Sequence, residues 1–356
     1  MRPTLIIGGG PAGAAAAIRL AQSGGRAVIA ERSATPPDQL CGGFLSWTTL
    51  RRLQEVGLNP FALGAQRVRR ARLFSRGRMA EARLPADAAG LSRRALDQAL
   101  LDRAAQAGAE IRRGLAVRSI EGRTVHYADG SSDTPERLIL ATGKHDVRGA
   151  IRPLPAHDPA MGLRWRFAAS ASLRQALGDA IELHLFDRGY AGLVLQEDGF
   201  ANLCLAVRHS AFLSAGRNPA ALLTALLGTV TSLTDRLTQE DMGQAQAIAN
   251  IPYGWRARGP SPDLYRIGDQ IGVIPSLAGE GIGIALLSGA AAADAIMKDV
   301  DPDACQQALS RRLAQPIGLA GLLWRMAERP ALASRGLPLL SRLPVITQAA
   351  MRLTRI

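Results

Sequence analysis

The stretch that decides the fold is TLIIGGGPAGAAAAIRLAQSGGRAVIAE, residues 4–31. It opens with four apolar or β-branched residues, which predict a short buried strand. The glycine turn GGGPAG follows at residues 8–13, and the alanine-rich run after it predicts a helix that stops at two glycines. The next run, RAVIA at residues 26–30, predicts a second strand that closes on Glu31. Strand, glycine turn, helix, strand and acidic residue in this order predict an α/β domain of the dinucleotide-binding type.

The glycines of this turn stand in the register Gly8-x-Gly10-x-x-Gly13. The first glycine permits a tight turn, the second lets the backbone approach a pyrophosphate, and the third lets the helix pack closely on the sheet. The start of the helix offers free N–H groups and a partial positive charge to the phosphates. Glu31 can accept hydrogen bonds from both hydroxyls of a ribose, which favours FAD or NAD over NADP.

Four further segments follow in an order that suits one large ligand. QLCGGFLSW at residues 39–47 holds two consecutive glycines, which predict a close approach of the backbone to a flat group. Residues 91–111 predict an amphipathic helix with Arg93 in its first turn, and RLILATG at residues 137–143 predicts a buried strand. Residues 264–296 predict a strand, a loop and a second glycine-rich helix start. A second helix N-terminus would therefore point at the ligand of the first.

On these segments the chain resembles the flavoprotein group that contains aromatic hydroxylases of the p-hydroxybenzoate hydroxylase type, geranylgeranyl reductases and flavin halogenases. The resemblance covers roughly residues 1–300. It implies a Rossmann-like α/β FAD-binding domain, an inserted antiparallel β-sheet substrate domain and a helical C-terminal tail. It also implies FAD as the cofactor and NAD(P)H as a transient electron donor.

The resemblance implies a role for each matching position. The first glycine turn and the pair Glu31 and Arg32 match the adenosine and pyrophosphate site, and Arg93 matches an arginine that reaches the pyrophosphate and ribityl region. The Cys-Gly-Gly turn matches the reductase branch's turn beside the isoalloxazine ring. The residues that we expect to bind FAD are Gly8, Gly10, Pro11, Ala12, Gly13, Glu31, Arg32, Cys41, Gly42, Gly43, Arg93, Val117, Thr142, Gly143, Asp269, Pro275, Gly279, Gly281 and Ile282.

The FAD-binding domain should be discontinuous, because its first glycine motif is at the N-terminus and its second lies near residue 269. Between the two motifs, runs of alternating apolar and polar residues predict strands. We expect an FAD-binding domain of residues 1–67, 85–155 and 255–305, a substrate-binding sheet of residues 68–84 and 156–254, and a helical tail of residues 306–356.

The chain departs from every branch of the group. The run ATGKHDVRG at residues 141–149 lacks the Asp-Gly pair of many hydroxylases, and Gly192 stands where the reductases carry a tryptophan, although their tyrosine remains as Tyr190. Our leading hypothesis is an FAD-dependent monooxygenase that hydroxylates an apolar aromatic or a polyketide- or quinone-type substrate with NAD(P)H and O2. The alternative is an FAD-dependent reductase of isoprenoid double bonds, which the Cys-Gly-Gly turn favours.

Three aromatic residues are candidates for a substrate pocket: Trp47, Trp165 and Tyr190. Core packing is the competing interpretation for large aromatic side chains, which are mostly buried. We assign no residue as catalytic, because in flavoenzymes the cofactor performs the chemistry. The scattered cysteines and histidines predict neither a disulfide framework nor a metal site.

The charge balance is basic, with 43 lysines and arginines against 30 acidic residues. Residues 51–113 hold 14 arginines and six acidic residues, which raises the hypothesis of a flavoprotein acting on RNA. No basic stretch is interleaved with aromatic residues, so we expect no nucleic-acid partner.

The tail is also basic, with eight arginines and one acidic residue over 311–356. Within it, Leu319, Leu322, Leu323 and Met326 form a helical stripe. The first interpretation is a helix packed on the FAD-binding domain, and the alternative is a lipid-facing lid. We expect no transmembrane helix, a small apolar substrate as partner and a cytoplasmic protein, with peripheral membrane contact through the tail as the alternative to its packing on the domain.

Overall fold

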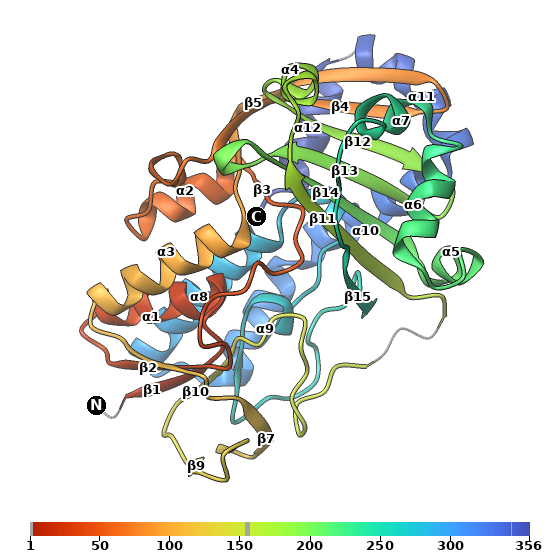
Figure 1. Cartoon of the computed structure of the whole chain (residues 1–356). Coiled ribbons are helices and arrows are strands. Elements are labelled where there is room, and N and C mark those ends of the chain that lie inside the picture. Colours follow the sequence, from red (N-terminus) through yellow and green to blue (C-terminus); the bar gives the residue numbers. More distant parts are fainter. Residues whose placement is uncertain (1–2, 154–156, 343) are drawn as a thin grey trace.

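The computed structural model describes residues 3–153, 157–342 and 344–356. Two sheets dominate it, one parallel and one mainly antiparallel (Figure 1). The predicted fold class is confirmed: a Rossmann-like α/β unit is combined with a second sheet and a helical tail. The predicted domain boundary between residues 155 and 156 lies outside the described residues.

The parallel sheet has five strands in the order β16-β10-β1-β2-β6. Its strands are β1 (Thr4–Ile7), β2 (Ala27–Glu31), β6 (Glu110–Arg113), β10 (Leu138–Leu140) and β16 (Tyr265–Arg266). One face carries the helices α1 (Pro11–Gln22), α3 (Arg93–Gln106) and α8 (Gly281–Met297). The other face is covered by the small sheet of β7 (Val117–Glu121), β8 (Thr124–Tyr127) and β9 (Ser132–Asp133).

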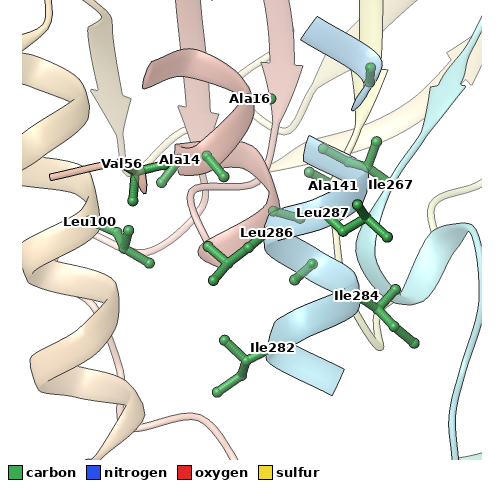
Figure 2. Packing of buried hydrophobic residues seen from close by; sticks show 14 of the residues in the cluster. Ala14, Ala16, Val56, Leu100, Ala141, Ile267, Ile282, Ile284, Leu286 and Leu287 are labelled. Atoms are coloured by element: carbon green, nitrogen blue, oxygen red, sulfur yellow. The ribbon is translucent and has the colours of Figure 1, made fainter. Parts of the chain in front are cut away.

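The helices α1 and α8 pack against each other through small residues. Figure 2 shows Ala14 and Ala16 of α1 in one cluster with Leu286 and Leu287 of α8. A Cβ on Gly289 would lie 2.3 Å from the carbonyl oxygen of Ala12, so only glycine permits this approach. The contact brings the N-termini of both helices to the same end of the sheet.

The second sheet has eight strands in the order β15-β11-β14-β13-β12-β4-β5-β3. The strands are β3 (Phe44–Leu45), β4 (Gln66–Ser75), β5 (Arg78–Gly90), β11 (Ala160–Ala168), β12 (Ala180–Phe186), β13 (Gly189–Leu195), β14 (Phe200–Arg208) and β15 (Gln246–Ile251). All neighbours are antiparallel except β12 and β4, which are parallel and join two parts of the chain that are far apart in sequence. Since β3 and the end of β5 join it, this sheet extends beyond residues 68–84 and 156–254, and our division into domains stays a prediction.

Short helices cover the outer face of the eight-stranded sheet. They are α4 (Ala171–Leu177), α5 (His209–Ser214), α6 (Pro219–Leu227) and α7 (Thr231–Leu237). Alternate residues of β11, among them Leu163, Trp165 and Phe167, point into the core beneath these helices. The inner face of the sheet is turned toward the parallel sheet.

The remaining helices are α2 (Trp47–Glu55), α9 (Pro302–Arg312), α10 (Ala314–Ala327), α11 (Pro330–Arg342) and α12 (Pro344–Leu353). The buried face of α10 carries Ile317, Ala320 and Trp324, so the stripe that the sequence suggested is not the packing face. Instead, Leu322 and Met326 of that stripe are exposed. In the described part of the chain, no helix is long and apolar enough to cross a membrane.

Candidate functional site

A cavity of about 560 Å³ lies between the two sheets. It opens at the carboxyl ends of β1, β2 and β10, where Ile7, Ala30 and Ala141 line it, and it extends to the inner face of the eight-stranded sheet. Open α/β sheets bind their ligands outside the carboxyl ends of the strands. The cavity is therefore where the fold places a dinucleotide.

The first glycine turn forms one wall of the cavity. Gly8 has φ +105°, and a Cβ there would lie 2.5 Å from the carbonyl oxygen of Ala141. A Cβ on Gly13 would lie 2.0 Å from the carbonyl oxygen of Gly8, which ties the turn to the helix. Gly10 is the N-cap of α1 and provides no side-chain cap, so the first N–H groups of the helix stay available to a phosphate.

Glu31 stands at the end of β2, as the motif requires. Its carboxylate accepts hydrogen bonds from the backbone N–H groups of Gly9 at 2.7 Å and Ser33 at 2.9 Å. These bonds fix the carboxylate at the cavity wall, and its remaining lone pairs suit a ribose. Nearby, Arg32 contacts the His145 ring at 2.7 Å. Burial and the positive charge of Arg32 lower the pKa of His145, so a neutral ring accepts this hydrogen bond.

Arg93 lies beside the first glycine turn, where the resemblance places a pyrophosphate. Its Nη2 is 3.5 Å from the position that a Cβ would take on Gly10. Asp97 holds the guanidinium through two hydrogen bonds, Nε to Oδ1 at 2.7 Å and Nη2 to Oδ2 at 2.6 Å. Because Asp97 is itself buried, the side chain of Arg93 has one fixed orientation.

The Cys-Gly-Gly turn is held in place by the eight-stranded sheet. Asn202 of β14 donates to the carbonyl oxygens of Cys41 at 3.1 Å and Gly42 at 3.0 Å. Arg164 of β11 in turn donates to the side-chain oxygen of Asn202 at 2.5 Å and to Asp38 at 2.6 Å. The turn therefore presents Cys41 and its glycines to the cavity in a fixed conformation.

The second glycine segment forms the opposite wall. Asp269 lines the cavity next to Gly268, whose N–H donates to Ser288 Oγ at 2.8 Å. Farther along, Glu280 is the buried N-cap residue of α8, and burial raises the pKa of its carboxyl. Arg355, from the far end of the chain, donates to Glu280 at 2.6 Å. Two helix N-termini, those of α1 and α8, thus face one space, as the sequence indicates.

A cluster of three hydroxyl groups occupies the cavity near this segment. The Tyr190 hydroxyl donates to Ser276 Oγ at 2.8 Å, and the Tyr253 hydroxyl lies 2.6 Å from the same atom. Burial raises the pKa of both phenols, so both are protonated at neutral pH. The Trp324 ring packs edge-on to both tyrosines. We name Tyr190, Tyr253 and Ser276 the hydroxyl cluster.

Most of the residues that we expect to bind FAD line this one cavity. They are Gly8, Gly10, Pro11, Ala12, Glu31, Arg32, Cys41, Gly42, Gly43, Arg93, Val117, Thr142, Gly143, Asp269, Gly279, Gly281 and Ile282. Gly13 and Pro275 are not among the lining residues: Gly13 packs against Gly8 and Ile6, and Pro275 precedes the lining residue Ser276. The individual contacts to FAD stay predictions.

Of the three aromatic candidates for the substrate pocket, only Tyr190 lines the cavity. The prediction for Trp165 is wrong, because its strand turns this side chain into the core on the outer face of the sheet. Trp47 is also outside the cavity lining and packs beneath the guanidinium of Arg355, 4.5 Å from its ring centroid.

Sequence reasoning missed several cavity residues. Tyr253 reaches the cavity from a loop that no motif marks, and Ser276 lies within the second glycine segment but was not itself expected to bind a ligand. Leu323, Met351 and Arg355 reach it from the tail, because the last helices fold back over the cavity. The rarity of tyrosine could have pointed to Tyr253. The chain has only four tyrosines, so each one in an apolar segment is a candidate for a ligand-binding hydroxyl.

Comparisons with known proteins agree with this site. The family described as FAD binding domain matches residues 1–148. A menaquinone reductase of Mycolicibacterium smegmatis is 26% identical over 316 residues, which cover 82% of this chain and 75% of the relative.

Solved structures share the fold over nearly the whole chain. A flavin-dependent brominase has a TM-score of 0.82 at 16% identity, covering 99% of this chain and 93% of the other. A geranylgeranyl bacteriochlorophyll reductase-like protein of Thermoplasma acidophilum has a TM-score of 0.78 at 18% identity, covering 99% and 94%.

The residues around the cavity also fit the chemical groups of FAD. Two uncapped helix N-termini suit a pyrophosphate and an electron-rich ring edge, Glu31 suits a ribose, and the glycines leave room that a Cβ would fill. Residues 1–148 match the FAD binding domain family, the flavin-dependent neighbours share the fold, and the chain is an FAD-dependent oxidoreductase with FAD as its cofactor.

Proposed function

We propose that this oxidoreductase hydroxylates an aromatic substrate that carries a long apolar chain, with NAD(P)H as electron donor. The reaction would convert the substrate, O2, NAD(P)H and a proton into the hydroxylated substrate, NAD(P)+ and water. FAD, when bound, supplies the redox chemistry. The chain's own residues position the aromatic ring, exclude water and bind the ring oxygen.

The hydroxyl cluster is the observation that carries this proposal. Tyr190, Tyr253 and Ser276 are three polar groups that converge in a part of the cavity lined mainly by apolar side chains. The apolar lining of that part comes from both the sheet and the tail: Ala71, Leu84, Ile181, Leu183, Ile248, Ile251, Leu323 and Met351. Such a pocket, apolar with a few convergent hydroxyls, suits a phenol oxygen attached to a hydrocarbon.

The cluster can do more than bind. Because Ser276 Oγ contacts both tyrosine hydroxyls, a proton can move along the three groups by rotation of the hydroxyls. Because Tyr190 gives its one hydrogen bond to Ser276, Ser276 can donate to Tyr253, and the protonated Tyr253 hydroxyl is then free to donate to a developing negative charge on the substrate oxygen. The side chains thus offer orientation and charge stabilisation.

Two observations favour a second candidate, the FAD-dependent reductase of isoprenoid double bonds. Cys41 lines the cavity in a rigid turn, as the resemblance to the reductase branch implies. The relatives in the sequence comparison are named menaquinone reductases. In that reaction the hydroxyl cluster would be the proton donor to the carbon that is reduced.

Oxygen consumption separates the two candidates. The holoenzyme is incubated with NAD(P)H, isotopically labelled O2 and an alkylphenol, and mass spectrometry follows the product. We expect oxygen uptake and one labelled oxygen atom in the product. Anaerobic, dithionite-driven addition of two hydrogens to the prenyl chain of menaquinone, with no reaction of the alkylphenol, would contradict hydroxylation.

Variants test the hydroxyl cluster itself. We expect Y253F and S276A each to lower kcat/KM roughly tenfold, the loss expected for one hydrogen bond to a charged group. Y127F is the matched control, because the Tyr127 hydroxyl donates to Asp133 in the small sheet, away from the cavity. Equal effects of Y127F and Y253F would exclude a specific role of the cluster.

A further inference from the structure

The outer side of the tail combines exposed apolar and basic side chains. On α10, Leu322 and Met326 are 47% and 41% exposed, and Arg325 is exposed beside them; Arg329 is exposed between α10 and α11. The spacing of three and four residues places Leu322, Arg325 and Met326 on one side of the helix axis. Leu332 and Arg335 continue the pattern on α11. We name these six side chains the tail face.

The arginines of the tail face lack the carboxylate partners that many buried or half-buried arginines of the molecule have. Arg93, Arg164 and Arg208, for example, are each paired with a carboxylate. Within the residues that the structure describes, Arg325, Arg329 and Arg335 have no ion-pair partner. Glu328, the one acidic residue of 311–356, is turned inward and bound by Arg208 at 2.9 Å. The positive charge of the tail face is therefore uncompensated.

The same helix also forms part of the cavity wall. Leu323 lines the cavity, and Trp324 packs on Tyr190 and Tyr253 of the hydroxyl cluster. Helix α10 thus separates the cavity on its inner side from the tail face on its outer side. A ligand leaving an apolar phase beside α10 would have a short path into the cavity.

We propose that the tail face docks the protein on a bilayer that contains anionic phospholipids. The three apolar side chains enter the acyl boundary, and the arginines bind headgroup phosphates. A second copy of this chain is a poor fit, because it would bring two uncompensated sets of arginines together. Binding of the tail face to lipid does not depend on which reaction the enzyme catalyses. Delivery of a lipid substrate to the cavity by this surface rests on the proposed function.

Vesicle flotation tests the surface without any activity measurement. The holoenzyme is mixed with vesicles of phosphatidylcholine alone or of phosphatidylcholine with phosphatidylglycerol. We expect binding to the anionic vesicles that falls with added salt, and weak binding to the neutral ones. The variant R325Q/R329Q/R335Q should lower the partition coefficient about a hundredfold, from about fivefold per arginine.

A matched control removes the same charge elsewhere. Arg26, Arg51 and Arg118 are exposed, lie outside the cavity lining and have no ion-pair partner among the described residues. The variant R26Q/R51Q/R118Q should therefore bind vesicles nearly as the unchanged protein does. Equal losses in the two triple variants would overturn the proposal, because net charge alone would then explain binding.

The apolar side chains are tested separately. L322S/M326S/L332S keeps every charge, and we expect it to lower the partition coefficient at least tenfold. Bound FAD and the circular dichroism spectrum show whether each variant is folded. Failure of the unchanged protein to bind anionic vesicles would overturn the proposal. So would a dimer in sedimentation velocity that this serine variant dissociates, because the tail face would then bind a second copy.

Activity measurements distinguish this proposal from the proposed function. If vesicle binding follows the expected pattern but no hydroxylation is found, the surface stands and the reaction assignment fails. If both hold, the arginine variant should turn over a substrate embedded in vesicles slowly and a substrate in detergent micelles at the unchanged rate.

Discussion

At the scale of single residues, Gly8 shows how backbone geometry sets the cofactor site. Its φ of +105° is open to glycine and strained for other residues, and its missing Cβ leaves space for the Ala141 carbonyl. Both demands arise where β1, β10 and the first helix meet. The same residue therefore determines the shape of the turn and the distance between neighbouring strands.

We expect G8A to lose bound FAD and to lower the free energy of unfolding by more than 2 kcal/mol, about 1 from the left-handed backbone and the rest from the clash. G24A is the control, since Gly24 has φ +80° but no atom within 4 Å of a Cβ. It should cost only about 1 kcal/mol and keep FAD. Visible absorbance and urea unfolding measure both. A yellow, stable G8A protein would contradict the structure.

Glu182 gives a residue-scale prediction away from the cofactor. It is fully buried on the outer face of the eight-stranded sheet, beside His184 and the guanidinium of Arg236. Burial raises the pKa of its carboxyl, but the nearby His184 ring and the hydrogen bonds from Arg236 outweigh burial and lower it to about 2. The unfolded chain has a value near 4.5. Because the folded pKa is the lower one, this contribution is present above pH 4.5 and is lost as the pH falls toward 2.

We therefore expect E182Q to be less stable by about 3 kcal/mol at neutral pH, with a difference that shrinks below pH 4.5. The control is E81Q. Glu81 and Glu182 both form ion pairs with Arg72, but Glu81 is partly exposed, so E81Q should lower the free energy of unfolding by less than about 1 kcal/mol. Urea unfolding at several pH values decides. A stability difference for E182Q that is constant with pH would show that ionisation of Glu182 contributes nothing.

At the scale of elements, the contact between α1 and α8 aligns the two helix N-termini of the site. We expect G289A to push the helices apart, since its Cβ would meet the Ala12 carbonyl at 2.3 Å. FAD affinity and stability should both fall, the latter by at least 1–3 kcal/mol. G318A on α10, where nothing lies within 4 Å, should instead stabilise the protein by up to about 1 kcal/mol. Calorimetry and FAD titration test the pair, and unchanged FAD affinity in G289A would be inconsistent with this contact.

Elements also mark what the sequence could and could not predict. The βαβ unit was predictable because its turn, helix and strands lie within residues 4–31, where local rules hold. The position of the Trp165 side chain was not predictable, because a one-residue shift in register would turn it to the other face of the sheet. The packing face of α10 was missed for a similar reason: two apolar stripes compete on this helix, and only tertiary contacts choose between them.

At the scale of the whole molecule, the cavity is built from all parts of the chain. The parallel sheet, the eight-stranded sheet and the tail each contribute lining residues, such as Gly10, Cys204 and Met351. No single segment contains the site, so composition and motifs could predict the cofactor but not the tail's part in the cavity. The basic tail, unexplained by sequence, both closes the cavity and presents the tail face.

A ligand that contacts all three parts should couple their stability. FAD binds the folded protein and not the unfolded chain, so at a concentration a thousandfold above its Kd it adds about 4 kcal/mol to the free energy of unfolding. We expect removal of FAD to lower Tm by several degrees and to speed hydrogen exchange in residues 36–43, in residues 268–280 and in the tail, because these segments border the cavity. Exchange in α6, which packs in the outer core and contributes no residue to the cavity lining, should change little and is the internal control. Faster exchange confined to the first glycine turn would mean that FAD leaves the tail untouched, and the tail would then not belong to the cofactor site.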